Sequence, residues 1–326
     1  MPSPTPPLLL AVPNASAGRD ERVLSALVRA LAPEADASPR LLDIHRDSDH
    51  DRSVFTLAGR QGEIASALVR AARAALERID LRSQSGVHPR VGALDVAPVV
   101  YPDPADRGAA CAEALTAAAF IGDELELPVF LYGDMATASE RRERAALRAG
   151  GPPALAERIA SGELAPDYGP HRLHPSAGAT LLTARPPLVA FNLELESNDV
   201  ELARRIAAEV RESGGGLRGV RALGLELAER GRAQVSFNVH DPYTVPLREV
   251  VGAVRARAPV ACAELVGLAP RAAFEAFPED IPVRGFDPTR HLIENALRSL
   301  AADGEDQGEA PTQAPGNPGR HDRRAG

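Results

Sequence analysis

Residues 40–59, RLLDIHRDSDHDRSVFTLAG, decide the fold of the first half of this chain. Two runs rich in β-favouring residues, RLLDIHRD and RSVFTLAG, flank the polar segment SDHD, and this pattern predicts a β-hairpin. Before the hairpin, PLLLAVP is typical of a buried strand, and a helix is expected to follow it after a cap at Asn14 or Ser16. After the hairpin, residues 62–80 have apolar side chains at helical spacing, and residues 91–101 form the next strand. The predicted order is β-α-β-β-α-β.

The second half of the chain repeats this order. Its predicted elements are a strand at 187–195, a helix at 198–213, a hairpin at 220–241 around the turn ERGR, a helix at 245–258 and a strand at 260–269. Two such units in one chain predict an α+β fold of two ferredoxin-like (βαββαβ) subdomains in tandem.

An insert separates the two repeats. It reads as a helix at 104–125, a strand at 128–133, a helical stretch at 139–162 that is broken by Gly-Gly-Pro-Pro, and an irregular segment at 164–180. Such a long irregular segment indicates a functional or a disordered loop. We therefore expect an N-terminal subdomain at 1–184, a C-terminal subdomain at 185–300 and a disordered, Pro/Gly-rich tail at 301–326.

The composition argues against several classes of protein. The 326 residues carry a formal net charge of −8 and include no lysine, so bulk attraction to nucleic acid is not expected and a Schiff-base or P-loop lysine is excluded. The sequence predicts neither a signal peptide nor a membrane-spanning segment. Cys111 and Cys262 lie in apolar contexts without a CxxC motif, and we expect them to be buried thiols in a reducing compartment. The chain is thus expected to be a soluble cytoplasmic protein.

His88 lies at the mouth of a predicted strand, in GVHPRVGALDV at residues 86–96. Pro89 holds the backbone of His88 extended and suits the first position of a strand. Because imidazole titrates near neutral pH, His88 is a candidate general acid/base. The alternative is a histidine that makes one structural hydrogen bond.

Two polar clusters permit other readings. HRDSDHDR at residues 45–52 offers nitrogen and oxygen ligands for a metal, as does HRLH at residues 171–174, but a polar hairpin turn and a crossover loop explain them as well. VPNASAGR at residues 12–19 is an anion site at a helix start or an ordinary cap. Asn192 and Asn238 occupy matching strand ends in the two halves and are either site residues or strand-end polarity.

Nine segments together resemble the glutamate formiminotransferase family, whose members use folate in the breakdown of histidine. In chain order the segments are VPNASAGRD, SDHDRSVFTLAG, HPRVGALDV, LPVFLYG, PDYGP, HPSAGAT, PLVAFN, AQVSFNVHD and AELVGLAP. They span about residues 9–270. Because the chain ends too soon to include a cyclodeaminase domain, we expect the stand-alone form, a homodimer in the cytoplasm.

The resemblance implies transfer of a formimino group from N-formimino-L-glutamate to N5 of tetrahydrofolate, with His88 as catalytic acid/base and no metal. The implied folate contacts are Gly169, Pro170, His171, Arg172, Leu173, His174, Pro175, Ser176, Ala177 and Gly178, with Gly215, Gly216 and Leu217. Arginine grips carboxylates bidentately, which makes Arg19, Arg52, Arg90 and Arg185 candidates for substrate binding. The further substrate candidates are Asn14, Asp49, Asn192 and Asn238, of which Asp49 would orient His88 or contact the amidinium.

Three positions depart from the family pattern. Val87 stands where the family usually has an acidic residue, Ala17 replaces a glutamate, and GGGLRG is a shorter and less charged second folate segment. These departures leave two alternatives to the transferase above: a non-catalytic folate-binding homologue, or a transferase that acts on a different one-carbon donor.

Overall fold

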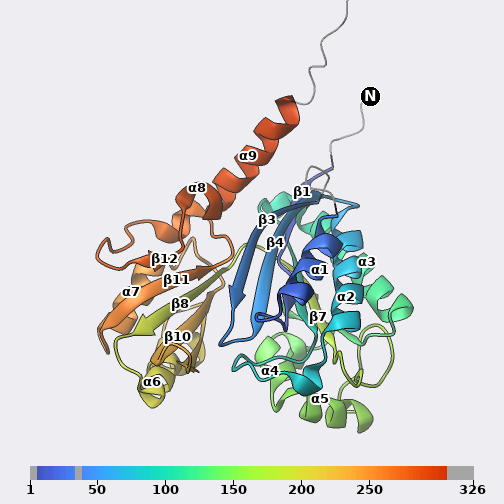
Figure 1. The fold of residues 1–326 in the computed structure, drawn as a ribbon, viewed down its shortest axis with the longest axis horizontal. Helices are drawn as coiled ribbons and strands as arrows, with labels where there is room; N and C mark the ends of the chain where they lie inside the picture. Colours follow the sequence, from blue (N-terminus) through green and yellow to red (C-terminus); the bar gives the residue numbers. More distant parts are fainter. Residues whose placement is uncertain (1–5, 34–38, 307–326) are drawn as a thin grey trace, which may run out of the picture.

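The protein is built from two β-sheets that face each other, with helices on their outer sides (Figure 1). The computed structural model describes the backbone of residues 6–33 and 39–306 and the side chains as far as Leu300. Successive side chains of a strand point to opposite faces of the sheet, one toward the core beneath the helices and the next toward the space between the sheets. In the hairpin strand at residues 52–60, Phe55 and Leu57 pack into the core beneath the helices, whereas Val54 and Thr56 line the space between the sheets.

The first sheet has, among the described residues, seven strands in the order β3-β4-(β1, β2)-β5-β7-β6. Their bounds are β1 (Leu8–Ala11), β2 (Asn14–Ala15), β3 (Arg40–Asp47), β4 (Arg52–Arg60), β5 (Leu94–Val100), β6 (Val129–Leu131) and β7 (Thr180–Arg185). β5, β7 and β6 are parallel neighbours, and the other pairs are antiparallel.

Two expectations for the first half are corrected. The strand expected at residues 7–13 is shorter, Leu8–Ala11, and a second short strand follows at Asn14–Ala15 after a break at Val12 and Pro13, where Pro13 has no N–H to donate. The helix cap is Asp20, whose side chain accepts hydrogen bonds from the amides of Arg22 and Val23, and Asn14 lies in β2 instead.

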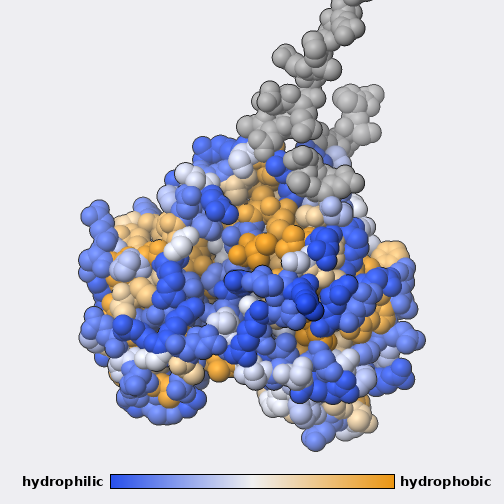
Figure 2. All heavy atoms as spheres, viewed as in Figure 1, coloured by the Kyte–Doolittle hydropathy of each residue, from blue (hydrophilic) through white to orange (hydrophobic). Residues whose placement is uncertain are grey.

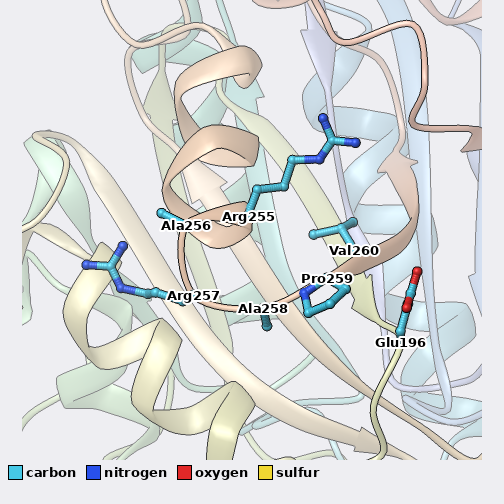
Figure 3. Close-up of a pocket in the computed structure, with 7 residues that line it drawn as sticks. All are labelled: Glu196, Arg255, Ala256, Arg257, Ala258, Pro259 and Val260. Carbon is cyan, nitrogen blue, oxygen red and sulfur yellow. The ribbon is translucent and has the colours of Figure 1, made fainter.

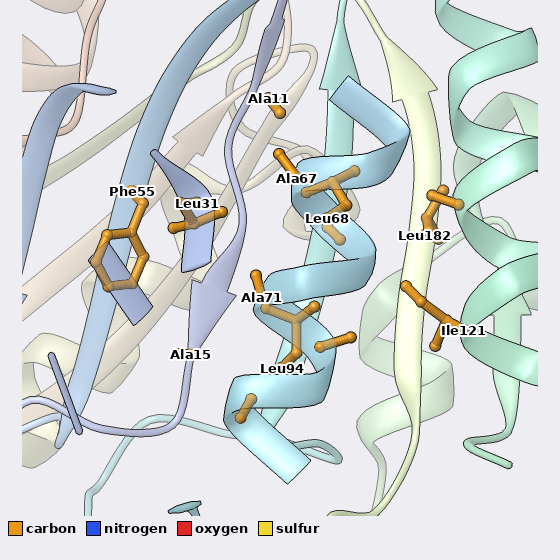
Figure 4. Close-up of a cluster of buried hydrophobic side chains, with 14 of the residues drawn as sticks. Ala11, Ala15, Leu31, Phe55, Ala67, Leu68, Ala71, Leu94, Ile121 and Leu182 are labelled. Atoms are coloured by element: carbon orange, nitrogen blue, oxygen red, sulfur yellow. The ribbon is translucent and has the colours of Figure 1, made fainter. Parts of the chain in front are cut away.

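Three helices cover the outer face of the first sheet: α1 (Glu21–Leu31), α2 (Ile64–Arg78) and α3 (Arg107–Glu124). Figure 4 shows Ala67, Leu68 and Ala71 of α2 among the apolar side chains of this core, which also include Leu94 and Ile121. The small alanine side chains bring the α2 backbone close to the sheet, and this core is continuous from α1 to α3.

The second sheet has the order β12-β11-β8-β10-β9 within the described part of the chain. Its elements are β8 (Val189–Leu195), α6 (Val200–Val210), β9 (Val220–Leu227), β10 (Arg232–Val239), α7 (Leu247–Arg255), β11 (Val260–Val266) and β12 (Val283–Arg284). Phe191, Val235 and Phe237 pack with α6 and α7 into a second core, separate from the first. The two halves thus each have a hydrophobic core of their own.

The insert closes one end of the space between the sheets. It contains α3, β6, the short helix α4 (Arg144–Arg148), α5 (Gly151–Ala160) and β7, a strand that the sequence reading missed. Leu147 of α4 and Leu155 of α5 pack against Phe130 and Leu181 of the sheet. Pro152 and Pro153 lie in the first turn of α5, where their missing N–H groups cost nothing, so the helical stretch breaks just before them.

The C-terminal helices close the other end. α8 (Pro288–His291) leads into α9 (Ile293–Asp306), and Ile293 and Ala296 pack with Leu10 of the first sheet and with Leu268, which follows β11. Figure 2 shows hydrophobic side chains gathered at this seam. The expected disordered tail from residue 301 is corrected in part, because α9 continues to Asp306; residues 307–326 lie outside the described part.

Two smaller findings bear on the composition argument. Cys111 and Cys262 are free but only partly buried, which corrects the expectation of buried thiols. No helix in the described part of the chain is both long enough and apolar enough to cross a membrane.

Candidate active site

Two contiguous cavities of about 70 Å³ each lie between the inner faces of the two sheets. Both are lined by Asn14 and Val54 of the first sheet, by Ala190 and Asn238 of the second and by Arg144 of the insert. One cavity is polar and contains three histidines, and the other is mainly apolar and extends toward α9. Residues from both halves and from the insert therefore meet at one place.

A buried ion cluster forms the floor of the polar cavity. Asp95 of β5 is fully buried and pairs with Arg52, 2.8 Å away, and with Arg148 of α4. Burial raises the pKa of Asp95, but the two guanidinium groups and the amide of Val91 outweigh it and hold that pKa well below its usual range. Arg52 also donates to Asn14 Oδ1 at 2.9 and 3.2 Å. The cluster has two cations and one anion, so it carries a net positive charge.

His88 lines the polar cavity beside this cluster and is half-buried. Its Nδ1 lies 2.8 Å from the carbonyl oxygen of Pro89. Because a carbonyl only accepts, this contact places the proton on Nδ1 and leaves a lone pair on Nε2. Desolvation and the charges of Arg52 and Arg148 lower the pKa of His88 well below 6.5. The ring is therefore neutral at pH 7 and holds a free basic nitrogen.

His50 is the neighbour of His88 in the cavity. The two ring centroids lie 5.7 Å apart, with the rings tilted by 53°. Burial lowers the pKa of His50, while the carboxylate of Asp47, which accepts the His50 amide at 2.8 Å, opposes that shift. The two histidines thus lie in unlike fields, one facing cations and the other facing carboxylates.

The second sheet contributes uncharged polar groups. Asn192, Ser236 and Asn238 line the cavities, and Asn192 donates to Glu264 at 3.1 Å. Gln234 lies on the same inner face of β10, fully buried, and its Oε1 has no hydrogen-bond partner among the described residues. This face offers amide groups to a polar ligand.

Another pocket lies away from these groups. It is an open surface hollow at the start of β11, lined by Glu196, by Val260 and by residues 255–259 (Figure 3). None of the predicted site residues lines it, and it holds no histidine. The cavities between the sheets are therefore the candidate site.

The geometry of the histidine clusters does not support a metal site. Within the described residues, no group of three or more His, Cys, Asp or Glu side chains is placed to hold a metal ion. Asp47 pairs instead with Arg230, and His174 Nδ1 accepts the amide of Ala177 at 3.0 Å.

Two family profiles cover most of the chain. Residues 8–185 match the N-terminal subdomain of the formiminotransferase domain, and residues 190–277 match the formiminotransferase domain itself.

The chain belongs to the formiminotransferase family.

Among relatives of this formiminotransferase, the glutamate formimidoyltransferase of Streptococcus pyogenes serotype M1 is 36% identical over 88% of this chain and 97% of that protein. The glutamate formimidoyltransferase of Thermoplasma acidophilum is 30% identical over 92% of this chain and 95% of that protein. The formimidoyltransferase-cyclodeaminase of Sus scrofa is 39% identical over 81% of this chain, which spans half of that protein.

The formiminotransferase structure brings six of the predicted residues together at the cavities. They are Asn14, Arg52, His88, Arg185, Asn192 and Asn238. The other predicted substrate residues lie elsewhere. Arg19 donates to Ser85 and faces Glu229, Asp49 Oδ1 accepts the amide of Glu229, and Arg90 donates to Gln84 and to the carbonyl of Gly86.

The predicted folate loop at 169–178 packs beside the segment that carries His88. Gly178 pairs with Gly92, and the carbonyl of Ser176 accepts the amide of Leu81 at 2.8 Å. Gly169 takes a positive φ of 78° and meets Gly122 of α3 so closely that a Cβ at either would collide with backbone. His171, Arg172 and Pro175 remain exposed, and none of the ten residues lines the two cavities.

The second predicted folate segment, residues 215–217, follows the C-terminal end of α6 in this formiminotransferase. Gly215 has a φ of 83°, and the amide of Leu217 donates to the carbonyl of Val210 at 2.9 Å. Gly216 approaches the Val210 carbonyl too closely for any Cβ. The segment lies near the insert, because Arg221 bridges Glu212 of this turn and Glu143 at 2.6 Å each.

Four titratable residues of the site were missed by sequence reasoning: His50 as a neighbour of His88, the buried Asp95, and Arg144 and Arg148 of α4. Asp95 is a charged residue inside an otherwise apolar strand, which was a signal of a buried partner. The spacing of Arg144 and Arg148 places both on one face of a helix, but nothing in the sequence indicates that this face meets the cavity.

Proposed function

We propose that this chain transfers the formimino group of N-formimino-L-glutamate to N5 of tetrahydrofolate, releasing glutamate, as part of histidine degradation. The proposal rests on family membership and on near-complete coverage of proteins named glutamate formimidoyltransferase. The single observation that supports the chemistry is that His88 lines a cavity between the two halves together with Arg52, Arg144 and Arg148.

The reaction requires the transfer of one proton from the folate nitrogen to the glutamate nitrogen. The folate nitrogen attacks the amidine carbon, and its proton passes to Nε2 of His88 as the tetrahedral species forms. The C–N bond to glutamate then breaks, and the same proton passes from His88 to the departing glutamate nitrogen. One imidazole that is neutral at the start serves as base and then as acid. The chain's lack of lysine is no obstacle, since no covalent enzyme intermediate is required.

The surrounding residues suit a substrate with carboxylates and an amidine. Arg52 and Arg185 supply guanidinium groups at the cavity, and Asn14, Asn192 and Asn238 supply amides. We assign Arg90 a positioning role, because its two hydrogen bonds brace the loop from Gln84 to Gly86 that leads to His88.

We further propose that the 169–178 loop and residues 215–217 contact folate. Support comes from their resemblance to the family's folate segments and from the bridge of Arg221 that joins the second segment to the insert. Homodimer formation and a cytoplasmic location remain proposals from the same resemblance.

The division into a ferredoxin-like subdomain at 1–184 and another at 185–300 is likewise proposed. Its support is the strand order. β5-β1-β4-β3 and β11-β8-β10-β9 each place the fourth strand of a βαββαβ unit beside the first, then the third and the second.

The replacement of the family's usual acidic residue by Val87 does not favour the alternative of a non-catalytic, folate-binding protein. The Val87 side chain is 43% exposed and does not line either cavity. The missing acidic group is therefore not lost from the cavity itself, and the transferase is the function that the geometry supports best.

The test is release of glutamate from N-formimino-L-glutamate in the presence of tetrahydrofolate, with the wild type and His88→Ala compared. We expect kcat to fall by about 10²–10⁴-fold in the variant, while circular dichroism and thermal unfolding stay those of a folded protein. Activity that persists in His88→Ala would remove His88 as the acid/base. A folded wild type that releases no glutamate would contradict the proposed reaction.

A further inference from the structure

His50 lines the same polar cavity as His88, and backbone contacts fix the two rings relative to each other. The ring centroids lie 5.7 Å apart. The amide of Val87, the residue before His88, donates to the carbonyl of Asp49, the residue before His50, at 3.2 Å. Gly86 lies so close to the backbone of His50 that an added Cβ would meet its carbonyl oxygen at 2.0 Å. The turn that contains His50 and the loop that contains His88 are therefore packed as one unit.

The proton of the His50 ring lies on Nδ1. Burial lowers the pKa of His50 from 6.5, so the ring is neutral at pH 7 and holds one proton. Its Nε2 lies 3.5 Å from Nε2 of Gln234, a fully buried residue of β10. Because an amide nitrogen only donates, Nε2 of His50 accepts in this contact and the proton is on Nδ1. Nδ1 has no hydrogen-bond partner among the residues that the structure describes, so it is an N–H donor available to a ligand.

The two rings offer complementary hydrogen-bonding groups to one ligand. Nδ1 of His88 lies 2.8 Å from the carbonyl oxygen of Pro89, which leaves Nε2 of His88 as an acceptor. His50 offers a donor instead. A ligand that meets both rings needs one N–H group and one nitrogen lone pair. The tetrahedral species of formimino transfer has both, on the attacking nitrogen and on the nitrogen that stays on the transferred carbon.

The lone pair on that retained nitrogen exists only during the reaction. In a protonated formamidine the lone pairs of both nitrogens are delocalised over the N–C–N group, and neither accepts a hydrogen bond. When the folate nitrogen attacks, the C=N electron pair moves to the retained nitrogen as the carbon becomes tetrahedral. When the C–N bond to glutamate breaks, that electron pair returns and the C=N bond forms again. A donor to the retained nitrogen therefore stabilises the tetrahedral species and not the bound substrate.

We propose that His50 is a second histidine of the reaction, whose Nδ1–H donates a hydrogen bond to the retained nitrogen of the tetrahedral species. No proton leaves His50 in this role. The inference rests on the proposed function, in which that nitrogen stays on the transferred carbon. Gln234 is a positioning residue, because it contacts His50 from the second sheet and fixes the Nδ1–H tautomer. The donor is thus complete only where the two halves of the chain meet.

Steady-state release of glutamate tests the donor with two variants of His50. The amide nitrogen of Asn can occupy the position of Nδ1, whereas that of Gln can occupy the position of Nε2. We expect His50→Gln to lower kcat by about 10–100-fold, as for one hydrogen bond lost from the transition state, with KM for N-formimino-L-glutamate unchanged. His50→Asn is expected to keep most of the wild-type kcat.

Ser48→Ala is the matched control for these variants. It removes the hydrogen bond of 2.7 Å that joins the same turn to Glu229 of the second half. Because it leaves the ring of His50 in place, we expect kcat and KM to stay those of the wild type. Thermal unfolding verifies that each variant is folded.

The ¹⁵N NMR shifts of the histidine rings test Gln234 without turnover. The ring signals that His50→Asn lacks identify His50, and in the wild type they are expected to show the proton on Nδ1. Gln234→Met keeps the length of the side chain and removes the amide donor, so we expect a mixture of the two His50 tautomers and a lower kcat. The tautomer of His88 is expected to stay unchanged, which a general loosening of the fold would not allow.

The outcomes separate this inference from the proposed function. A low kcat in His50→Gln that His50→Asn restores supports the inference. Equal kcat values in these two variants, a rise in KM alone, or a wild-type His50 protonated on Nε2 would overturn it and leave the proposed reaction in place. A folded wild type that releases no glutamate would contradict the proposed reaction, and the role of His50 would fall with it.

Discussion

The neighbouring rings of His50 and His88 lie among different charges. Burial and the charges of Arg52 and Arg148 lower the pKa of His88, whereas His50 faces the carboxylates of Asp47 and Glu264 as well as Arg52. A neutral ring with a free Nε2 suits the removal of a proton from an attacking amine. The electrostatic surroundings of neither ring could be read from the spacing of the histidines, because the charges come from four separate segments.

The depressed pKa of His88 predicts the pH dependence of the reaction. The base must be neutral, so kcat/KM is expected to stay level as pH falls through 6.5 and to decline only at more acidic pH. The same lowered pKa of His88 also predicts how the stability of the fold depends on pH. Between the two pKa values the unfolded chain binds a proton that folded His88 does not, so this residue's contribution to stability is lost as pH falls below 6.5. Initial rates and thermal unfolding between about pH 5 and 8 give both curves.

Arg148→Gln tests whether neighbouring cations contribute to the low pKa of His88. Removing one of the two cations that lower the pKa of His88 should move the acidic limb of kcat/KM upward. An acidic limb centred at or above pH 6.5 in the wild type would contradict the assignment of a depressed pKa.

At the scale of elements, backbone contact holds the His88 segment against the 169–178 loop. Gly92 lies where an added Cβ would meet the carbonyl oxygen of Ala179 at 1.9 Å, so the two segments can approach only through glycine. The hairpins were predicted from alternation, but β7 was not, because Thr180–Arg185 follows a long aperiodic loop and pairs only with strands distant in sequence.

Gly92→Ala tests this contact. We expect the free energy of unfolding to fall by about 2 kcal/mol, since the backbone must move to admit the methyl group. Urea denaturation measures the change. Gly252→Ala in α7 is the control: no atom lies within 4 Å of its Cβ position, and alanine there should stabilise the helix by about 0.5–1 kcal/mol. Equal behaviour of the two variants would show that Gly92 is not closely packed.

At the scale of the molecule, polar contacts join two halves that have separate cores. Arg230, in the turn of the second hairpin, pairs with Glu194 of its own sheet at 2.9 Å and with Asp47 of the first at 3.3 Å. The cavities between the halves are smaller than the roughly 300 Å³ usual for ligand sites. Entry of a folate is therefore expected to require that α4 or the second half move outward.

Arg230→Gln is expected to destabilise the whole molecule. The carboxylates of Asp47 and Glu194 are almost fully buried and would lose a shared cation, which we expect to cost about 1–3 kcal/mol, because Arg230 itself is partly exposed. Urea denaturation followed by circular dichroism measures the loss. Arg204→Gln, which breaks an exposed pair on α6, should change the free energy of unfolding by less than about 0.5 kcal/mol. A loss in Arg230→Gln as small as in this control would mean that the halves are not coupled here.

Local patterns in the sequence determined most of the elements and several residues of the site. Alternation in β4, β8 and β10 separates core residues from those of the opposite face, and on that face lie Arg52, Asn192 and Asn238. The HPR motif, and not alternation, identified His88 as a candidate. Only the tertiary structure decided that Asp95 joins Arg52 to Arg148, that His50 lies beside His88 and that Arg144 lines the cavities. The physical reason is that periodicity reports which face of an element avoids water, whereas which two faces meet depends on the packing of segments far apart in the chain.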